Sequence, residues 1–366
     1  MKKLTALFLT LALSLSLTAC GAKQDSPAQS APAASAPASS ASAASASASS
    51  VPAGEAESER SGFSIAALKG PTAMGLVNLM ARSGMSGAEG AAVTAPEGEA
   101  LPYTFTLAGA ADEVTPLLIK GELDMACVPA NLAATLYNKT QGEIVTLAIN
   151  TLGVIYIVEK GDTVQSMADL AGKTVVGAGK GSTPEFGLRY LLQENGIDPD
   201  SGVTLDWKSE HSECVAALAG GAASIALLPQ PFVTVAQAKV EGLRIALDLT
   251  AEWDALDNGS GMVTGVIVAR KSVVEENPEA VAAFLNDYAE SVTWANGNIS
   301  DAAQLIGAYG IVDAAVAEKA LPYCNIVCIT GQEMKQTLSG YLQVLFDANP
   351  ASVGGILPGE DFYHGA

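Results

Sequence analysis

A long internal repeat constrains the fold of this chain more than any other feature of its sequence. The first copy alternates apolar strand patterns with helical patterns over residues 63–149, and the second copy follows the same order over residues 173–247. Each copy contains a Gly-to-Pro unit, 121–129 and 220–229, typical of a turn followed by a buried strand. Strands that alternate with helices indicate βαβ units and parallel pairing. The duplication therefore predicts an α/β fold with two similar lobes, each a mainly parallel sheet flanked by helices.

After the second copy, the chain is predicted to return to the first lobe. Residues 265–269 have the pattern of one more strand, and the rest is mostly helical with no new strand expected. Two crossings between the lobes, near Leu152 and Met262, would make a hinge. The expected boundaries are 63–152 for lobe 1, 153–262 for lobe 2 and 263–366 for the segment that rejoins lobe 1.

The first 62 residues have the composition of an export signal and a tether. Lys2 and Lys3 precede an apolar run that is too short for a comfortable membrane span. Small residues then precede Cys20, as in the bacterial lipobox, where the cysteine is lipidated; an ordinary signal peptide with an incidental cysteine is the alternative. We expect a lipoprotein signal peptide over residues 1–19 and a disordered Ala/Ser/Pro tether over residues 20–62.

Charge and residue types argue against several other functions. A formal net charge of −20 disfavours nucleic acid as a partner. The histidines, His211 and His364, are not at ligand spacing from the cysteines, so no metal or cofactor is expected, and His211 is expected at the surface. The glycine-rich segment 177–182 misses the phosphate-loop and dinucleotide fingerprints, and no catalytic residue is predicted. Cys324 and Cys328 are the one close cysteine pair, and a disulfide between them is left open.

From residue 63 onward the chain resembles periplasmic-binding-protein type II receptors of the nitrate, sulfonate, taurine and thiamine-precursor group. The resemblance rests on the lipobox and tether, on residues 121–131, on Asp-Leu-Ala-Gly-Lys at 169–173 before a strand, and on 179–183. It implies the two-lobed type II fold with two crossover strands, and the solute-binding lipoprotein of an ABC importer. A permease and its ATPase subunit would be the partners. Lipid on Cys20 would hold a monomer at the outer face of the cytoplasmic membrane.

Candidate ligand-binding residues follow strands at matching positions in the two copies. In open sheets, ligands bind beyond the carboxyl ends of strands, where helices begin with free N–H groups. Glycine permits close approach of the backbone, and hydroxyl groups there either contact a ligand or only cap the helix. Amide side chains can recognise a polar ligand. The candidates are Lys69, Gly70, Pro71, Thr72, Pro129, Asn131, Asn150, Gly181, Ser182, Thr183 and Gln230.

The sequence thus predicts capture of a small polar or anionic solute between two lobes, without catalysis. Two alternatives are a tethered receptor that presents its ligand to a membrane sensor, and an enzyme on the same fold of the thiamine-precursor type. Export and anchoring argue against the enzyme. The helix starts favour a carboxylate, sulfonate or phosphate, while Asn131 and Gln230 suit a neutral amide or heterocycle equally well.

Overall fold

The computed structural model describes residues 62–366, which belong to one compact unit. The predicted signal peptide at 1–19, the lipid acceptor Cys20 and the tether up to residue 61 lie outside the described residues. Over residues 62–366, no helix combines the length and the apolar character that a membrane crossing requires.

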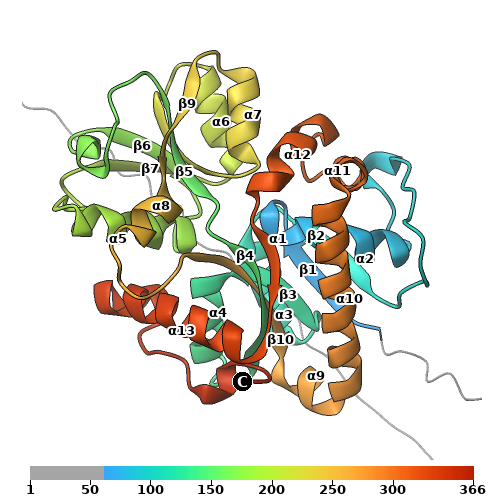
Figure 1. Cartoon of the computed structure of the whole chain (residues 1–366). Coiled ribbons are helices and arrows are strands. Elements are labelled where there is room, and N and C mark those ends of the chain that lie inside the picture. The colour runs from blue at the N-terminus through green and yellow to red at the C-terminus, as the bar shows by residue number, and fades with distance from the viewer. Residues whose placement is uncertain (1–61) are drawn as a thin grey trace, which may run out of the picture. The chain divides into compact units, whose positions relative to one another are not determined.

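The first sheet contains both parallel and antiparallel strands (Figure 1). Its order is β11 (Ile326–Ile329), β4 (Ile144–Leu152), β10 (Val263–Arg270), β3 (Met125–Pro129), β1 (Ser64–Leu68) and β2 (Thr104–Ala108). β1 pairs in parallel with β2 and β3, whereas β10 is antiparallel to β3 and β4, and β11 is antiparallel to β4.

The second sheet follows the same plan. Its order is β7 (Thr204–Lys208), β6 (Thr174–Ala178), β8 (Ile225–Pro229), β5 (Ile155–Lys160) and β9 (Leu243–Asp248). β6 pairs in parallel with β7 and β8, whereas β5 is antiparallel to β8 and β9.

The strand orders confirm the duplication that the sequence predicts. The parallel triplet β2-β1-β3 corresponds to β7-β6-β8, and in each sheet an antiparallel strand lies next to it, β10 or β5. β5 and β10 are also the first strands after each crossing between the sheets. The sheets are therefore mixed rather than mainly parallel, because the crossing strands enter in the opposite direction.

Helices cover both faces of each sheet. On one face of the first sheet lie α3 (Ala111–Lys120), α4 (Ala130–Lys139) and α13 (Gly331–Ala348). On its other face lie α1 (Pro71–Met74), α2 (Val77–Arg82), α9 (Lys271–Glu276), α10 (Pro278–Gly297), α11 (Ile299–Ala308) and α12 (Ala314–Ala320). The second sheet carries α5 (Thr183–Glu194) and α8 (Leu249–Asp254) on one face, and α6 (His211–Ala219) and α7 (Phe232–Lys239) on the other. Short 3-10 helices are η1 (Ala88–Gly90), η2 (Met167–Leu170), η3 (Leu321–Tyr323), η4 (Pro350–Val353) and η5 (Glu360–Phe362).

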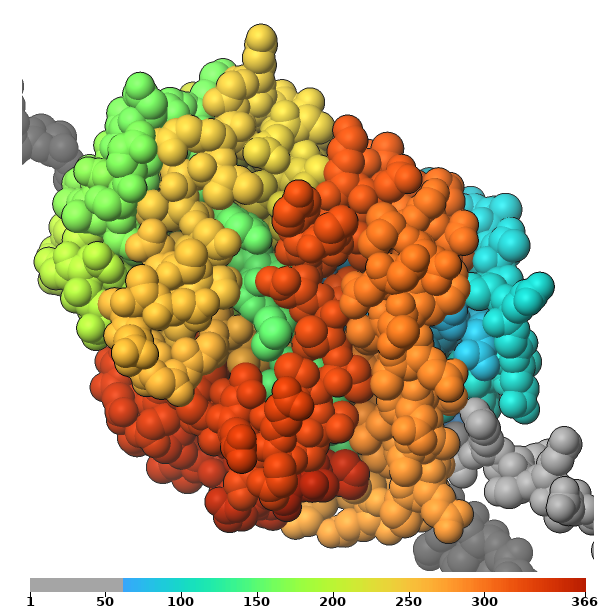
Figure 2. Space-filling view, in the orientation of Figure 1, coloured from blue at the N-terminus to red at the C-terminus, as the bar shows by residue number. Residues whose placement is uncertain are grey.

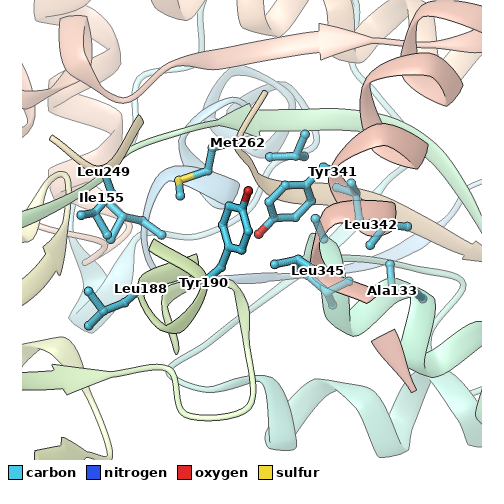
Figure 3. Packing of buried hydrophobic residues seen from close by; sticks show 14 of the residues in the cluster. Ala133, Ile155, Leu188, Tyr190, Leu249, Met262, Tyr341, Leu342 and Leu345 are labelled. Carbon is cyan, nitrogen blue, oxygen red and sulfur yellow. The ribbon is translucent and has the colours of Figure 1, made fainter. Parts of the chain in front are cut away.

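One hydrophobic core is shared by the two lobes (Figure 3). Tyr190 on α5 packs on Trp253 with ring centroids 4.8 Å apart, and Trp253 packs on Tyr341 of α13 at 5.3 Å. Trp253 and Tyr341 are fully buried. Because α13 belongs to the first lobe and α5 to the second, separating the lobes on this side would expose aromatic surface. Trp253 is therefore a packing residue.

Two expectations about local structure are wrong. β11 is a new strand in a region expected to be helical, and four residues with an irregular register are too few to give a periodic pattern. The spacing of Met74, Val77 and Met80 predicts one helix, but the structure breaks this segment into α1 and α2 at Gly75. A Cβ atom at Gly75 would lie 2.7 Å from the hydroxyl oxygen of Tyr288, so the backbone here packs directly against α10.

Candidate functional site

The predicted turns of the two copies meet at the start of β10. Thr72, in the first turn of α1, places Cγ2 2.6 Å from where a Cβ atom at Gly265 would be. Thr183, the first residue of α5, donates its hydroxyl to the carbonyl oxygen of Thr264 at 3.4 Å. Thr264 and Gly265 are consecutive residues of β10, so helix starts from both lobes approach one point of the second crossing.

Asn131 joins the lobes directly. Its Nδ2 donates to the carbonyl oxygen of Gly181 at 3.3 Å and to that of Ser352 at 2.9 Å. Its Oδ1 lies 3.4 Å from the hydroxyl oxygen of Thr183, whose single hydrogen is directed either to this oxygen or to Thr264 O. The side chain is 1% exposed. In this conformation the side chain of Asn131 therefore links the two lobes by hydrogen bonds.

Asn150 lies beside this junction with an unused donor. Its Oδ1 accepts from the hydroxyl of Thr151 at 3.0 Å and lies 2.6 Å from the position of a Cβ at Gly265. Burial raises the pKa of the neighbouring Cys127 thiol to about 12, and Asn150 partly offsets that rise. Sulfur is a weak acceptor, and Nδ2 of this fully buried side chain has no conventional partner within residues 62–366. Leaving a buried amide donor without an acceptor costs free energy.

The remaining candidates lie in or beside the strand-to-helix turns of the two lobes. Gln230 is 4% exposed, and its Oε1 accepts from the Thr234 hydroxyl at 2.9 Å. Gly70 has a φ of 149°, a value that favours glycine, at the turn before α1. Pro129 is the N-cap residue of α4, and Pro71 begins α1. The side chains of Lys69 and Lys180 are exposed, and the Ser182 hydroxyl donates to Gly179 O at 2.7 Å.

Sequence reasoning missed Glu185. The side chain is 9% exposed, and its Oε2 accepts the backbone N–H of Gly181 at 2.6 Å. A signal was present, because Ser182 followed three positions later by Glu185 is the spacing of a capping box. The carboxylate thus occupies a donor that the sequence assigned to a ligand.

His211 is not a freely exposed residue as expected. It begins α6, which packs on α7, and its ring centroid lies 5.2 Å from that of Phe232. Nδ1 is buried and lacks a partner within the described residues. Burial lowers the pKa of His211 to about 4. The residue type alone did not reveal the burial of His211, because the first residue of a helix can point either towards the protein or towards solvent.

The cysteines give no crosslink in the described part of the chain. Cys127, Cys214, Cys324 and Cys328 are all free, and Cys127 and Cys214 are fully buried. Across residues 62–366, no group of three or more His, Cys, Asp or Glu side chains is arranged to hold a metal ion.

Figure 2 shows the surface hollowed between the yellow residues of the second lobe and the red residues of α12 and β11, with green residues at its base. α12 contacts α7 across this hollow. A separate cavity of about 1170 Å³ lies between the segment 91–97 and α11. None of the predicted ligand-binding residues lines that cavity.

Comparison with known proteins assigns the chain to a family. Residues 98–319 match the family described as the phosphonate ABC transporter periplasmic substrate-binding protein. This match spans more than half of the chain, and the chain belongs to that family. A binding protein of Brucella abortus (strain 2308) is 26% identical over 183 residues, which are 50% of this chain and 55% of that protein. The match thus spans about half the length of this relative.

Solved structures share the fold at low sequence identity. An ABC transporter structure from Parabacteroides distasonis superposes with a TM-score of 0.65 and 23% identity, covering 82% of this chain and 98% of that one. The periplasmic aliphatic sulphonate-binding protein of Escherichia coli gives 0.61 and 16%, covering 81% and 92%. These similarities confirm the two-lobed periplasmic-binding-protein fold.

Proposed function

We propose that this chain is the solute-binding protein of an ABC importer, which captures a small polar solute between its lobes and catalyses no reaction. The convergence of Thr72 and Thr183 on Gly265 and Thr264 carries the proposal. The starts of α1 and α5 belong to different lobes. Both can therefore contact one solute only when the lobes are closed. Family membership supports the same function and implies delivery to a permease and its ATPase subunit.

The lobes would open about the shared aromatic core. Tyr190, Trp253 and Tyr341 pack together on one side, while α7 and α12 meet on the other. Separating the lobes costs less free energy where less apolar surface is buried, so the lobes would open between α7 and α12. A solute shifts the equilibrium towards closure only through contacts that it makes in the closed form. The lobe boundaries near residues 152 and 262 are part of this proposal.

The site is tested by a thermal-shift screen followed by calorimetry. Neutral amides, amines, heterocycles, carboxylates, sulfonates and phosphonates form the panel. Thr72→Ala combined with Ser182→Ala is expected to weaken binding of the best solute about tenfold, as loss of one or two hydrogen bonds would. Thr94→Ala, in an exposed segment, is the control. Unchanged affinity in the double variant would remove these turns from the site.

Anchoring is a separate part of the proposal. The small residues before Cys20 support lipidation of its sulfur after export, and multiple acyl chains would give stable attachment. Cys20→Ser is expected to release the protein from the membrane fraction. Membrane retention of that variant would contradict the anchor. A single species of monomer mass in light scattering is also expected.

A further inference from the structure

The cavity of the first lobe lies apart from the junction of Thr72 and Thr183. Its volume is about 1170 Å³, and its walls are the segment 91–97 on one side and α10, α11 and the start of α12 on the other (Figure 1). Pockets for small molecules usually have volumes of about 300–1,000 Å³. This cavity is therefore large enough to hold a stretch of polypeptide.

Neither wall of the cavity is part of the duplicated core. In the first copy of the repeat, residues 83–103 connect α2 to β2, whereas residues 195–203 make the corresponding connection between α5 and β7 in the second copy. The opposite wall belongs to the helical segment that follows the second copy. The duplicated fold therefore does not explain why these two elements enclose a cavity.

The wall formed by residues 92–97 has a backbone without hydrogen bonds. Within the described part of the chain, the N–H and C=O groups of these residues pair with no other backbone or side-chain group, and Pro96 has no N–H to offer. An exposed row of unpaired backbone groups is a template for pairing with another chain. An extended peptide can bind in this way through its own backbone.

The side chains of the cavity carry negative charge only. Glu97, Asp301 and Asp313 line it, and no Lys, Arg or His side chain does. None of the three carboxylates has an ion pair or a hydrogen-bond partner within residues 62–366. The half-buried ring of Trp294 also lines the cavity, and aromatic rings attract cations. A surface with this charge favours Lys and Arg side chains of a partner.

We propose that this cavity is a docking site for an extended segment of a protein partner that is rich in Lys and Arg. The backbone of residues 92–97 would pair with the backbone of that segment, while the three carboxylates and Trp294 would contact its basic side chains. The docking site goes beyond solute capture, because none of the predicted ligand-binding residues lines the cavity.

The test titrates the full chain with three synthetic hexapeptides by calorimetry. A basic peptide alternates arginine and valine, an acidic peptide alternates glutamate and valine, and the third is the basic peptide with N-methyl groups on its valines. N-methylation removes backbone donors and keeps the charge.

The control must be matched in charge, because a protein with a net charge of −20 attracts any basic peptide. Glu97→Gln combined with Asp301→Asn is therefore compared with Glu275→Gln combined with Glu279→Gln. All four side chains are exposed, and the second pair lies outside the cavity. Melting curves show whether both double variants fold.

We expect wild-type protein and the control to bind the basic peptide and not the acidic one. The cavity variant should bind the basic peptide about fivefold more weakly, since two exposed charge contacts are lost. Equal affinities of the two double variants would overturn the docking site. Wild-type protein that binds neither peptide, for instance because residues 20–61 fill the cavity, would also overturn it.

The N-methylated peptide tests the backbone pairing separately. We expect it to bind wild-type protein at least about fivefold more weakly than its parent, because its valines cannot donate to residues 92–97. Equal affinity of the two basic peptides would contradict docking by backbone pairing. This comparison needs no variant, so it decides the proposal even if the cavity variant does not fold. Solute binding in the thermal-shift screen is a separate measurement, and it is expected whatever the peptides do.

Discussion

Asn131 Nδ2 donates a hydrogen bond to the carbonyl oxygen of Gly181 at 3.3 Å, although the two residues belong to different lobes. Asn131 stands at the start of α4 and Gly181 just before α5, and each follows a strand of its own repeat copy. The duplicated architecture thus brings two helix starts together, and a single amide side chain joins them.

Substitution of Asn131 tests this hydrogen-bonded link between the lobes. Asn131→Ala removes the bonds to Gly181 and Ser352 and leaves the buried carbonyl group of Ser352 without that donor. The free energy of unfolding should fall by about 1–3 kcal/mol, measured by urea denaturation. Asn195→Ala is the control, because its exposed side chain bonds only to Leu191 O of its own helix. Equal losses in the two variants would contradict a special role for Asn131.

Gly265 tests how closely the two turns pack. A Cβ in Gly265→Ala would lie 2.6 Å from both Asn150 Oδ1 and Thr72 Cγ2, so these side chains must move. We expect a destabilisation of about 1–3 kcal/mol and weaker solute binding. Gly261→Ala adds the same methyl group to the same crossing, where nothing lies within 4 Å. If Gly265→Ala changed neither stability nor solute binding, the side chains at this junction would be less closely packed than the structure shows.

His211 makes stability depend on pH. Burial lowers its folded-state pKa from 6.5 to about 4, so the unfolded chain binds more protons between those values. The contribution of the neutral ring is fully present above pH 6.5 and is lost as the pH falls towards 4. His211→Gln should flatten the fall in free energy of unfolding between pH 6.5 and 4.5, measured by denaturation at several pH values. An unchanged slope would contradict burial of this ring.

The shared core is tested by truncating Tyr341. Its side chain is fully buried against Trp253, so Tyr341→Ala should cost about 3–5 kcal/mol of unfolding free energy. Tyr323→Ala is the control, since that ring is 61% exposed and its loss should cost less than about 0.5 kcal/mol. Similar costs for the two variants would refute a shared core at α13.

The repeat made the fold largely predictable from sequence. Strands β1 and β6 and the helix after β6 were expected within a few residues, whereas the helix expected after β1 is broken at Gly75. The strand β11 was not, because four partly buried residues carry too little periodicity. β5 lies between the two repeat copies, and no strand was expected there. The antiparallel direction of β10 was also hidden, since a strand pattern reads the same in both directions.

The site was predicted at the level of turns rather than atoms. Thr72 and Thr183 both lie beside β10, and their contact with a solute stays a prediction. Which atoms remain free depends on contacts between distant residues, such as Asn131 with Ser352. Glu185 could have been recognised from its capping-box spacing, whereas Gly265 had no local signal.

Closure of the lobes is measured most directly by the distance between spin labels at Lys239 on α7 and Lys319 on α12, both exposed. A second pair, at Gln193 on α5 and Gln343 on α13, reports on the shared core. When a solute that raises the melting temperature is added, the α7–α12 distance should shorten and the α5–α13 distance should stay constant. Two unchanged distances in the presence of such a solute would contradict capture between closing lobes.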